Sequence, residues 1–414
     1  MVAGETAMAI ALADSLFLSI SPDAARAKVI LFLAVSMAPF VVVAPLIGPV
    51  IDRTKGGQRI VVLLVGVLRA LVLVGMANSL DSLSLFPLAF AALVLGKTYA
   101  ISKSALVPTT VAGEAELVGA NSRLGQIAGI TGFVVAAPAG LAQLIDTRAA
   151  LGIGIVAFLG AAMNAYRLPR QRIAEGPPDT REREELRSVE IARAAAAMRV
   201  LRASVGFMFF HLAFWLRREI AGTAWFGLAV ALSGLATLGA NFVGPWLRTR
   251  LRVASMLASS LAAVALAGAA AAVYNRVLGG ILLAAVVNAA AATGRLAFES
   301  TVQSGAPDAN RGRAFARFET GNQLAWVLGG LVPVIVSPAG RVGFGMVALI
   351  GAGGVFLFVR AGGLGEVDQR AVTRYRGERA TGQEHRPRSE SEGSPPTPRG
   401  WAARRHRRVP PRRR

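Results

Sequence analysis

The sequence contains no cysteine, and it has few charged residues for its length. The absence of cysteine excludes disulfide bonds, thiolate zinc sites, iron–sulfur clusters and thiol catalysis. Charged residues make up 17% of the 414 positions, whereas a soluble globular protein carries roughly 25%. Because apolar runs of about 18 residues or more also recur, the composition places the chain in a lipid bilayer.

Enzyme motifs are absent as well. The three histidines have no metal-ligand spacing, and the sequence has neither a nucleophile elbow nor paired catalytic carboxylates. Gly96-Lys97-Thr98 matches the end of a phosphate-binding loop, but Ala91 stands where the first glycine of that loop belongs. We therefore predict a protein that is not an enzyme and that has no cofactor and no metal.

Apolar segments long enough to cross a bilayer recur twelve times along the chain. They lie at about residues 3–20, 29–50, 60–79, 84–106, 119–144, 149–167, 196–216, 223–247, 253–274, 277–298, 317–337 and 342–361. The first segment has no basic residue before it and carries Glu5 and Asp14 within it, so we read it as a membrane helix and not as a cleaved signal. The pattern predicts an all-α integral membrane protein.

A polar interval divides these segments into two sets of six. We predict a six-helix bundle at 1–167, a cytoplasmic linker at 168–195 and a second six-helix bundle at 196–362. The remaining residues, 363–414, are rich in Pro, Ser and Arg, which predicts disorder. The excess of basic residues beside a membrane domain favours contact with anionic lipids over binding of nucleic acid.

The basic residues between the segments indicate the orientation of the chain. The connectors rich in basic residues contain Arg53, Lys55, Arg59, Arg248, Arg250, Arg252, Arg311 and Arg313. The connectors on the opposite side are poorer in basic residues, although "LRRE" at 216–219 runs against the trend. Because positive charges stay on the cytoplasmic side, we predict a multi-pass protein of the plasma (inner) membrane with both termini cytoplasmic.

Two pairs of glycines indicate an internal repeat. The stretch "GPVIDRTKGGQR" begins at Gly48, and "GPWLRTRLR" begins at Gly244, which is 196 residues later (244 − 48). The same offset separates Gly125 in "NSRLGQ" from Gly321 in "FETGNQ". Two offsets in register predict two parallel six-helix halves, the arrangement of transporters that have a central cavity.

The charged stretch after the second segment resembles the loop 2–3 signature of the major facilitator superfamily. The resemblance rests on Gly48, Asp52, Arg53, Gly57 and Arg59. It extends over about residues 1–362 through the layout of six plus six segments. The segment "ANSRLGQIAGITGFVVAAPAG" resembles the fifth helix of drug:proton antiporters related to macrolide exporters. The segment "DANRGRAFARFETGNQLAWVLGGLVPV" resembles the stretch that leads into the eleventh helix of actinobacterial-type members.

The resemblance implies a gate at the cytoplasmic end. Asp52 would face the positive N-terminus of the eleventh helix, near Ala316–Glu319, and hold that end shut. Lys103 would be a static partner of Asp52, and Arg123 and Glu319 would belong to the same gate. The alternative is that the charges of the loop only fix topology and meet lipid.

Charges inside the segments are candidates for proton coupling, because an ionised group in a bilayer is costly. Asp14 lies nearest the middle of the first helix and is the first candidate, and Glu5 is the second. Arg69 and Lys97 would be basic partners, so a permanent structural pair is the alternative role for Asp14. We expect Arg295 and Glu299, one turn apart, to satisfy each other.

Other residues are assigned to the cavity only because helices 1, 4, 7 and 10 line it in the superfamily. These candidates are Phe17, Tyr99, Ser102, Phe207, Phe210, His211, Trp215 and Asn288. For His211 a hydrogen bond to a neighbour is the alternative, and for the aromatic residues the alternative is packing.

We expect a secondary transporter that works by alternating access and exports amphiphilic small molecules in exchange for protons. The export direction and the monomeric state come from the resemblance alone. A proton-coupled metabolite importer and a non-transporting sensor or scaffold with the same fold are the alternatives. The permease subunit of an ATP-driven pump is a more distant one.

Overall fold

The computed structural model describes residues 1–17, 57–80, 82, 84–111, 116–168, 188–218, 220, 222–305 and 311–362. Over these ranges the chain is helical and contains no strand. The contacts along the chain define one compact unit, Met1–Gly365, and a second unit, Glu366–Arg414, which lies outside the described residues. The predicted all-α fold is confirmed.

The helices before residue 168 are α1 (Val2–Phe17), α3 (Gly57–Ala77), α4 (Leu85–Leu106), α5 (Leu117–Ile145) and α6 (Thr147–Ala165), with a 3-10 turn, η1, at Val107–Thr110. The helices after residue 188 are α8 (Val189–Trp215), α9 (Gly222–Arg250), α10 (Val253–Tyr274), α11 (Val277–Gly305), α12 (Arg311–Val336) and α13 (Gly340–Arg360), with a 3-10 turn, η3, at Leu216–Arg218.

Eight of the described helices are long and apolar enough to cross a membrane. At about 1.5 Å of rise per residue, even the 21-residue α3 reaches about 32 Å, which matches a hydrocarbon core of about 30 Å. Every predicted segment but one coincides with a helix, and the exception, 29–50, lies outside the described residues. The count of twelve therefore stays a prediction.

Several predicted ends are corrected. We placed residues up to 195 in the linker, but α8 already begins at Val189, where the Ser188 hydroxyl accepts a hydrogen bond from the Ile191 N–H at 3.4 Å. Likewise α11 continues beyond residue 298 to Gly305. Helix ends follow hydrogen bonding and capping, so a helix extends past its apolar stretch wherever the next turns can still form those bonds.

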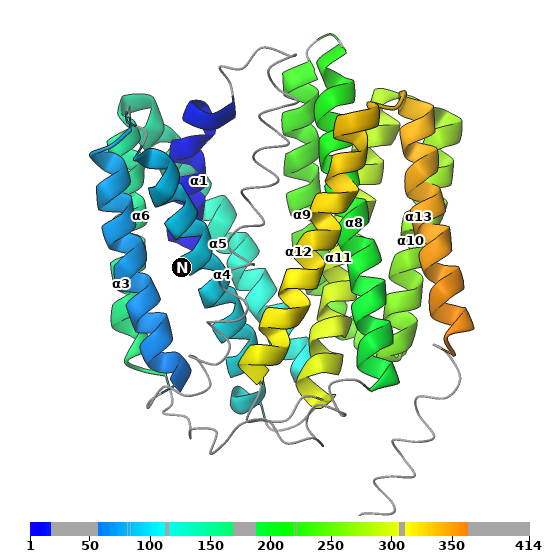
Figure 1. Cartoon of the computed structure of the whole chain (residues 1–414), viewed down its shortest axis with the longest axis horizontal. Coiled ribbons are helices and arrows are strands. Elements are labelled where there is room, and N and C mark those ends of the chain that lie inside the picture. The colour runs from blue at the N-terminus through cyan, green and yellow to red at the C-terminus, as the bar shows by residue number, and fades with distance from the viewer. Residues whose placement is uncertain are drawn as a thin grey trace, which may run out of the picture. The chain divides into compact units, whose positions relative to one another are not determined.

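The helices form two groups within the first unit (Figure 1). Helices α1, α3, α4, α5 and α6 contact one another, and α8 to α13 contact one another. Contacts between the groups run from α4 to α12 and from α5 to both α9 and α11. Figure 1 shows α4 and α5 on the side of the first group that faces α9, α11 and α12.

Glycines allow helices to approach closely within the second group. A β-carbon on Gly351 of α13 would lie 2.5 Å from the Ala265 nitrogen of α10, and one on Gly268 of α10 would lie 2.6 Å from the Ala348 nitrogen of α13. Real β-carbons do not come so near to backbone atoms. Two glycines therefore let the backbones of α10 and α13 touch, as small residues do in membrane helix pairs.

One end of the helices carries more arginine than the other, and we call it the basic end. It includes Arg59 at the start of α3, Arg248 and Arg250 at the end of α9, Arg252, and Arg360 at the end of α13. At the opposite end α5 and α6 meet at Asp146, whose side chain accepts a hydrogen bond from the Arg148 N–H at 2.8 Å.

Candidate functional site

The larger of two adjoining cavities among the described helices has a volume of about 580 Å³ and lies among α1, α3, α4, α5 and α11. Its polar lining consists of Glu5, Arg69, Lys97, Tyr99, Lys103, Thr131 and Arg295. Much of the remaining wall is apolar, with Met8, Leu93, Leu124 and Ile127 among its residues. A cavity of this size and mixed lining suits a drug-sized molecule.

An ion pair joins α1 to α3 at this cavity. Arg69 donates a hydrogen bond from Nη1 to Oε1 of Glu5 at 2.5 Å. The Arg69 side chain is 2% exposed, whereas that of Glu5 is 41% exposed. The Arg69 guanidinium also lies 4.3 Å from the ring centroid of Phe158, a cation–π contact. In this ion pair the arginine is buried, whereas the carboxylate is partly exposed at the cavity wall.

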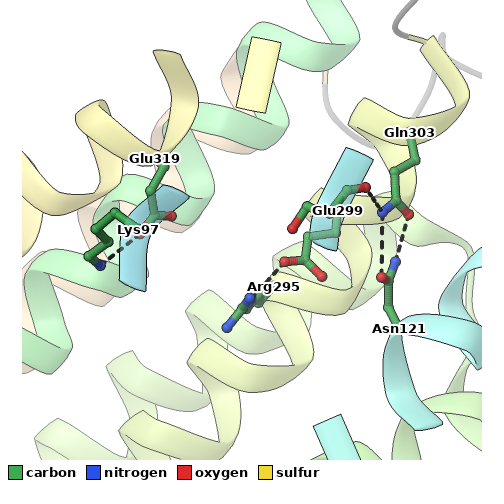
Figure 2. A network of polar contacts seen from close by, with 7 residues as sticks. Lys97, Asn121, Arg295, Glu299, Gln303 and Glu319 are labelled. Carbon is green, nitrogen blue, oxygen red and sulfur yellow. Dashed lines mark hydrogen bonds and ion pairs between the residues drawn. The ribbon is translucent and has the colours of Figure 1, made fainter. Parts of the chain in front are cut away.

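The smaller cavity, of about 200 Å³, lies among α4, α8, α11 and α12. It shares Lys97, Ala100 and Arg295 with the larger one. Lys97 of α4 donates to Oε1 of Glu319 on α12 at 3.1 Å, so this ion pair bridges the two groups of helices (Figure 2).

Glu299 on α11 accepts a hydrogen bond from Arg295 Nε at 2.8 Å (Figure 2). The pairing that we predicted from their spacing of one turn is confirmed. Gln303 lies one turn further along α11, so the three polar side chains follow one face of that helix.

Amide side chains join α11 to the first group. Asn121 of α5 donates to Oε1 of Gln303 at 2.6 Å, and Gln303 donates in return to Oδ1 of Asn121 at 3.4 Å (Figure 2). Gln303 also donates to the backbone oxygen of Ser104 on α4 at 3.1 Å. All three residues are buried. We call these contacts the amide clasp.

A second set of hydrogen bonds joins α5 to α9 beside the amide clasp. Gln126 donates to the backbone oxygen of Asn241 at 3.0 Å, and the Ser122 hydroxyl donates to the same oxygen. Gly125 lies against the Asn241 side chain, where a larger residue would collide with it. These hydrogen bonds, the amide clasp and the Lys97–Glu319 ion pair hold the two groups of helices together towards the basic end.

The predicted gate is only partly visible. Gly48, Asp52 and Arg53 lie outside the described residues, and Gly57 is the first residue of α3. Arg59 lies 5.0 Å from the ring centroid of Tyr166.

Three further gate residues are described. Lys103 lines the larger cavity, Arg123 is exposed, and Glu319 pairs with Lys97. One expectation needs correction: α12 begins at Arg311, so Ala316–Glu319 lies inside the helix, beyond the first turn where a helix dipole acts.

Of the proton-coupling candidates, the structure brings Glu5, Arg69 and Lys97 to the larger cavity. The alternative role for Asp14 was a permanent ion pair with Arg69 or Lys97. The side chain of Asp14 lies outside the described residues, and the two cations pair with Glu5 and Glu319 respectively.

Among the cavity candidates, Tyr99 lines the larger cavity. Ser102 is buried, and its hydroxyl has no hydrogen-bond partner among the described residues. Asn288 donates to the Ala284 oxygen of its own helix. The side chain of Phe17 lies outside the described residues.

The candidates on α8 line neither cavity. Phe207, His211 and Trp215 pack around Phe344 of α13 or against one another, with ring centroids 5.3 to 6.2 Å apart. Phe210 packs against Trp326 of α12 at 5.6 Å. Because α8 packs against α12 and α13, these side chains do not reach the two cavities, where we expected them.

The sequence interpretation missed the residues that join the two groups. These are Ser104, Asn121, Ser122, Gln126, Asn241 and Gln303. It also missed Arg202, which lines the smaller cavity. A signal was available, because polar residues one turn apart within apolar helices, such as Ser122 and Gln126, mark a face that needs polar partners. The described residues contain no group of three or more histidines and acids that could hold a metal ion.

Comparison with known proteins gives a family and a fold. Residues 3–330 match the Major Facilitator Superfamily. An uncharacterized protein of Mycobacterium leprae is 30% identical over 392 residues, which cover 84% of this chain and 67% of that protein.

Two solved structures have the same fold at low identity. A bacterial homologue of the iron transporter ferroportin in its outward-facing state has a TM-score of 0.64 and 17% identity, over 87% of this chain and 96% of that one. A proton:xylose symporter has a TM-score of 0.66 and 13% identity, over 87% and 92%.

Proposed function

This chain belongs to the Major Facilitator Superfamily and has the fold of its secondary transporters, and we propose that it exports amphiphilic small molecules in exchange for protons. The observation that carries the proposal is the larger cavity, which is lined in part by the membrane-length helices α3, α5 and α11 and combines apolar walls with ionised side chains. Ionised groups at that depth are costly and mark substrate or ion pathways.

Alternating access requires a barrier that can open. The amide clasp, the Ser122 and Gln126 hydrogen bonds and the Lys97–Glu319 ion pair lie between the two groups of helices. We propose that they form the cytoplasmic barrier and separate when the two groups rock apart. The basic end then faces the cytoplasm and its anionic lipids, both termini are cytoplasmic, and the protein acts as a monomer in the inner membrane.

Glu5 is the carboxylate through which we propose that protons couple to transport. It is the acid of α1 that the described structure places at the cavity, and its only described ion-pair partner is Arg69. Protonation removes the charge that holds Arg69, which frees the guanidinium to interact elsewhere. Asp14 is the second candidate on the same helix.

The test uses everted membrane vesicles with an acidic interior and a pH-sensitive dye. Amphiphilic compounds should release protons from vesicles that contain the wild-type protein. The Glu5→Gln variant should lose this release. The Asp14→Asn variant should lose it only if Asp14 is the coupling carboxylate. Asp146→Asn is the matched control, because that acid caps α6 away from the cavity and asparagine also caps helices.

Each outcome decides between the alternatives. Release that survives in both Glu5→Gln and Asp14→Asn would place coupling elsewhere. Compound uptake with protons moving in the same direction would favour an importer. Folded protein that moves neither compounds nor protons would contradict the transporter proposal and favour a sensor.

A further inference from the structure

Every described carboxylate that lines the two cavities is already neutralised by a cation. Glu5 pairs with Arg69, Glu319 pairs with Lys97, and Glu299 pairs with Arg295. The three ion pairs together carry no net charge. The charge available to a ligand therefore depends on the other ionised side chains of the two linings.

Two cations remain. Lys103 of α4 lines the larger cavity, and Arg202 of α8 lines the smaller one. Neither forms an ion pair within the described part of the chain. Both cations also feel nearby carboxylates electrostatically: Arg202 feels Glu319, and Lys103 feels Glu299, Glu5 and Glu319. Each of these carboxylates, however, already accepts a hydrogen bond from another cation.

The two cations border one polar region, because the cavities share Lys97, Ala100 and Arg295. Uncompensated positive charge inside a membrane is unfavourable unless a counter-ion or water satisfies it. A bound anion would fill that need. A cation would instead meet two charges of its own sign.

The apolar residues of the lining indicate that the ligand also has an apolar part. Leu93, Leu124 and Ile127 line the larger cavity. Its volume of about 580 Å³ lies within the range of roughly 300–1,000 Å³ that holds drug-sized molecules. The cavity thus offers an apolar surface to the body of a molecule and positive charge to its headgroup.

We propose that the substrate is an organic anion, a soluble amphiphile whose carboxylate, sulfonate or phosphate group binds at Lys103. Arg202, in the adjoining cavity, adds the attraction of its positive charge. This inference rests on the proposed transport function and names its substrate class. Exported molecules would therefore be amphiphilic acids and not the amphiphilic cations that an acidic cavity would select.

The binding test uses three probes that share one apolar body: naphthalene sulfonate, naphthyl methanol and naphthyl methylamine. Binding is measured by equilibrium dialysis with purified full-length protein in nanodiscs of zwitterionic lipid. The sulfonate should bind at least about tenfold more tightly than the alcohol, because a charge-assisted contact is among the stronger hydrogen bonds. The amine should bind least.

Substitutions then locate the headgroup. Lys103→Gln should weaken sulfonate binding about tenfold, and Arg202→Gln should weaken it less, while alcohol binding stays unchanged and reports a folded cavity. Lys103→Arg should retain the preference for the sulfonate. Arg199→Gln is the matched control, because Arg199 is an exposed arginine of α8 that lines neither cavity.

Charge reversal gives the sharpest readout. Lys103→Glu should favour the amine over the sulfonate, which a purely structural role for Lys103 would not produce. Equal binding of the three probes to wild type, or sulfonate binding unaffected by Lys103→Gln, would overturn the proposal. Saturation by anionic lipid in place of the soluble sulfonate, measured as competition in lipid-doped nanodiscs, would overturn the choice of a soluble substrate.

Failure of this inference is separable from failure of the proposed function. If proteoliposomes transport the amine or the alcohol in exchange for protons and ignore the sulfonate, the exporter stands and the anion assignment fails. If the sulfonate binds as expected but no probe is transported, the binding site stands and the exporter fails.

Discussion

At the scale of single residues, Arg69 shows how this chain tolerates a charge among apolar helices. Arg69 as a whole is 1% exposed. Its guanidinium has one carboxylate partner, Glu5, and one aromatic neighbour, Phe158. The Arg69 Nε atom has no hydrogen-bond partner within the described residues. Arg69 therefore depends on Glu5 for most of its electrostatic compensation, because removing one partner leaves a buried charge exposed to an apolar environment.

A double-mutant cycle tests this dependence. Glu5→Ala should reduce the free energy of unfolding by about 2 kcal/mol, below the roughly 3–5 kcal/mol of a fully buried pair, because the Glu5 side chain is 41% exposed. Adding Arg69→Met should restore most of the loss, since no unpaired cation then remains. Unfolding in mixed micelles followed by circular dichroism measures both. Additive losses in the double variant would contradict the coupling.

Sequence reasoning at this scale succeeds for local pairs and fails for distant ones. The Arg295–Glu299 pair follows from a spacing of one turn. The partner of Lys97 is Glu319, 222 residues away, and nothing in the sequence relates the two. His211 and Phe207 could not be placed because residues 205–215 of α8 are apolar apart from His211, so no polar stripe there indicates which face meets a cavity.

At the scale of helices, the apolar segments of the sequence predicted where the described helices lie, but they predicted the ends of those helices less accurately. Hydropathy reports the part of a helix that lies in lipid, whereas the hydrogen-bonded helix extends beyond it, as α8 and α11 do at Val189 and Gly305. Packing between helices is less visible in the sequence. The chain has 45 glycines, and only the structure distinguishes those at contacts from those facing open space.

Two glycines of α13 give a matched test of that distinction. Gly351→Ala should lower the free energy of unfolding by about 1–3 kcal/mol, because its new β-carbon would meet the Ala265 backbone at 2.5 Å. Gly353 has no atom within 4 Å of the corresponding position. Gly353→Ala should leave stability unchanged or raise it by up to about 1 kcal/mol through helix propensity. Thermal unfolding of both variants in one detergent makes the comparison.

Equal losses in the two alanine variants would mean that α13 is sensitive to any added side chain. The contact between α10 and α13 would then not be the cause. A loss confined to Gly351→Ala would assign the effect to the close approach of these two helices.

At the scale of the whole first unit, we predicted an internal repeat and a charged cytoplasmic gate that includes Glu319, but we did not predict the uncharged contacts that join the two groups of helices. The repeat stays a prediction that rests on paired glycines, of which Gly125 lies against Asn241 of α9 and Gly321 lies against Arg199 of α8. The proposed barrier leaves little sequence signal, because most of its contacts involve uncharged amides that face each other only when the helices assemble. From the sequence we assigned that role to charged residues, of which Glu319 takes part in the proposed barrier and Asp52 lies outside the described part of the chain.

The absence of cysteine makes the barrier directly testable, because introduced thiols have no background. Gly125 and Asn241 face each other between α5 and α9. In Gly125→Cys with Asn241→Cys, oxidation should form a disulfide that prevents α5 and α9 from separating. The hydrogen bonds from Ser122 and Gln126 remain available, because they end on the backbone oxygen of residue 241.

If transport requires these two helices to part, oxidation of the double variant should abolish substrate-dependent proton release, and a reductant should restore it. Asn241→Cys alone should be indifferent to oxidation, which controls for damage by the oxidant. Substrate binding from the opposite side should persist in the locked protein, because the disulfide holds the helices in the arrangement that already contains the cavity. Full transport with a complete disulfide would mean that α5 and α9 move together, and the barrier would then have to open between α4 and α12.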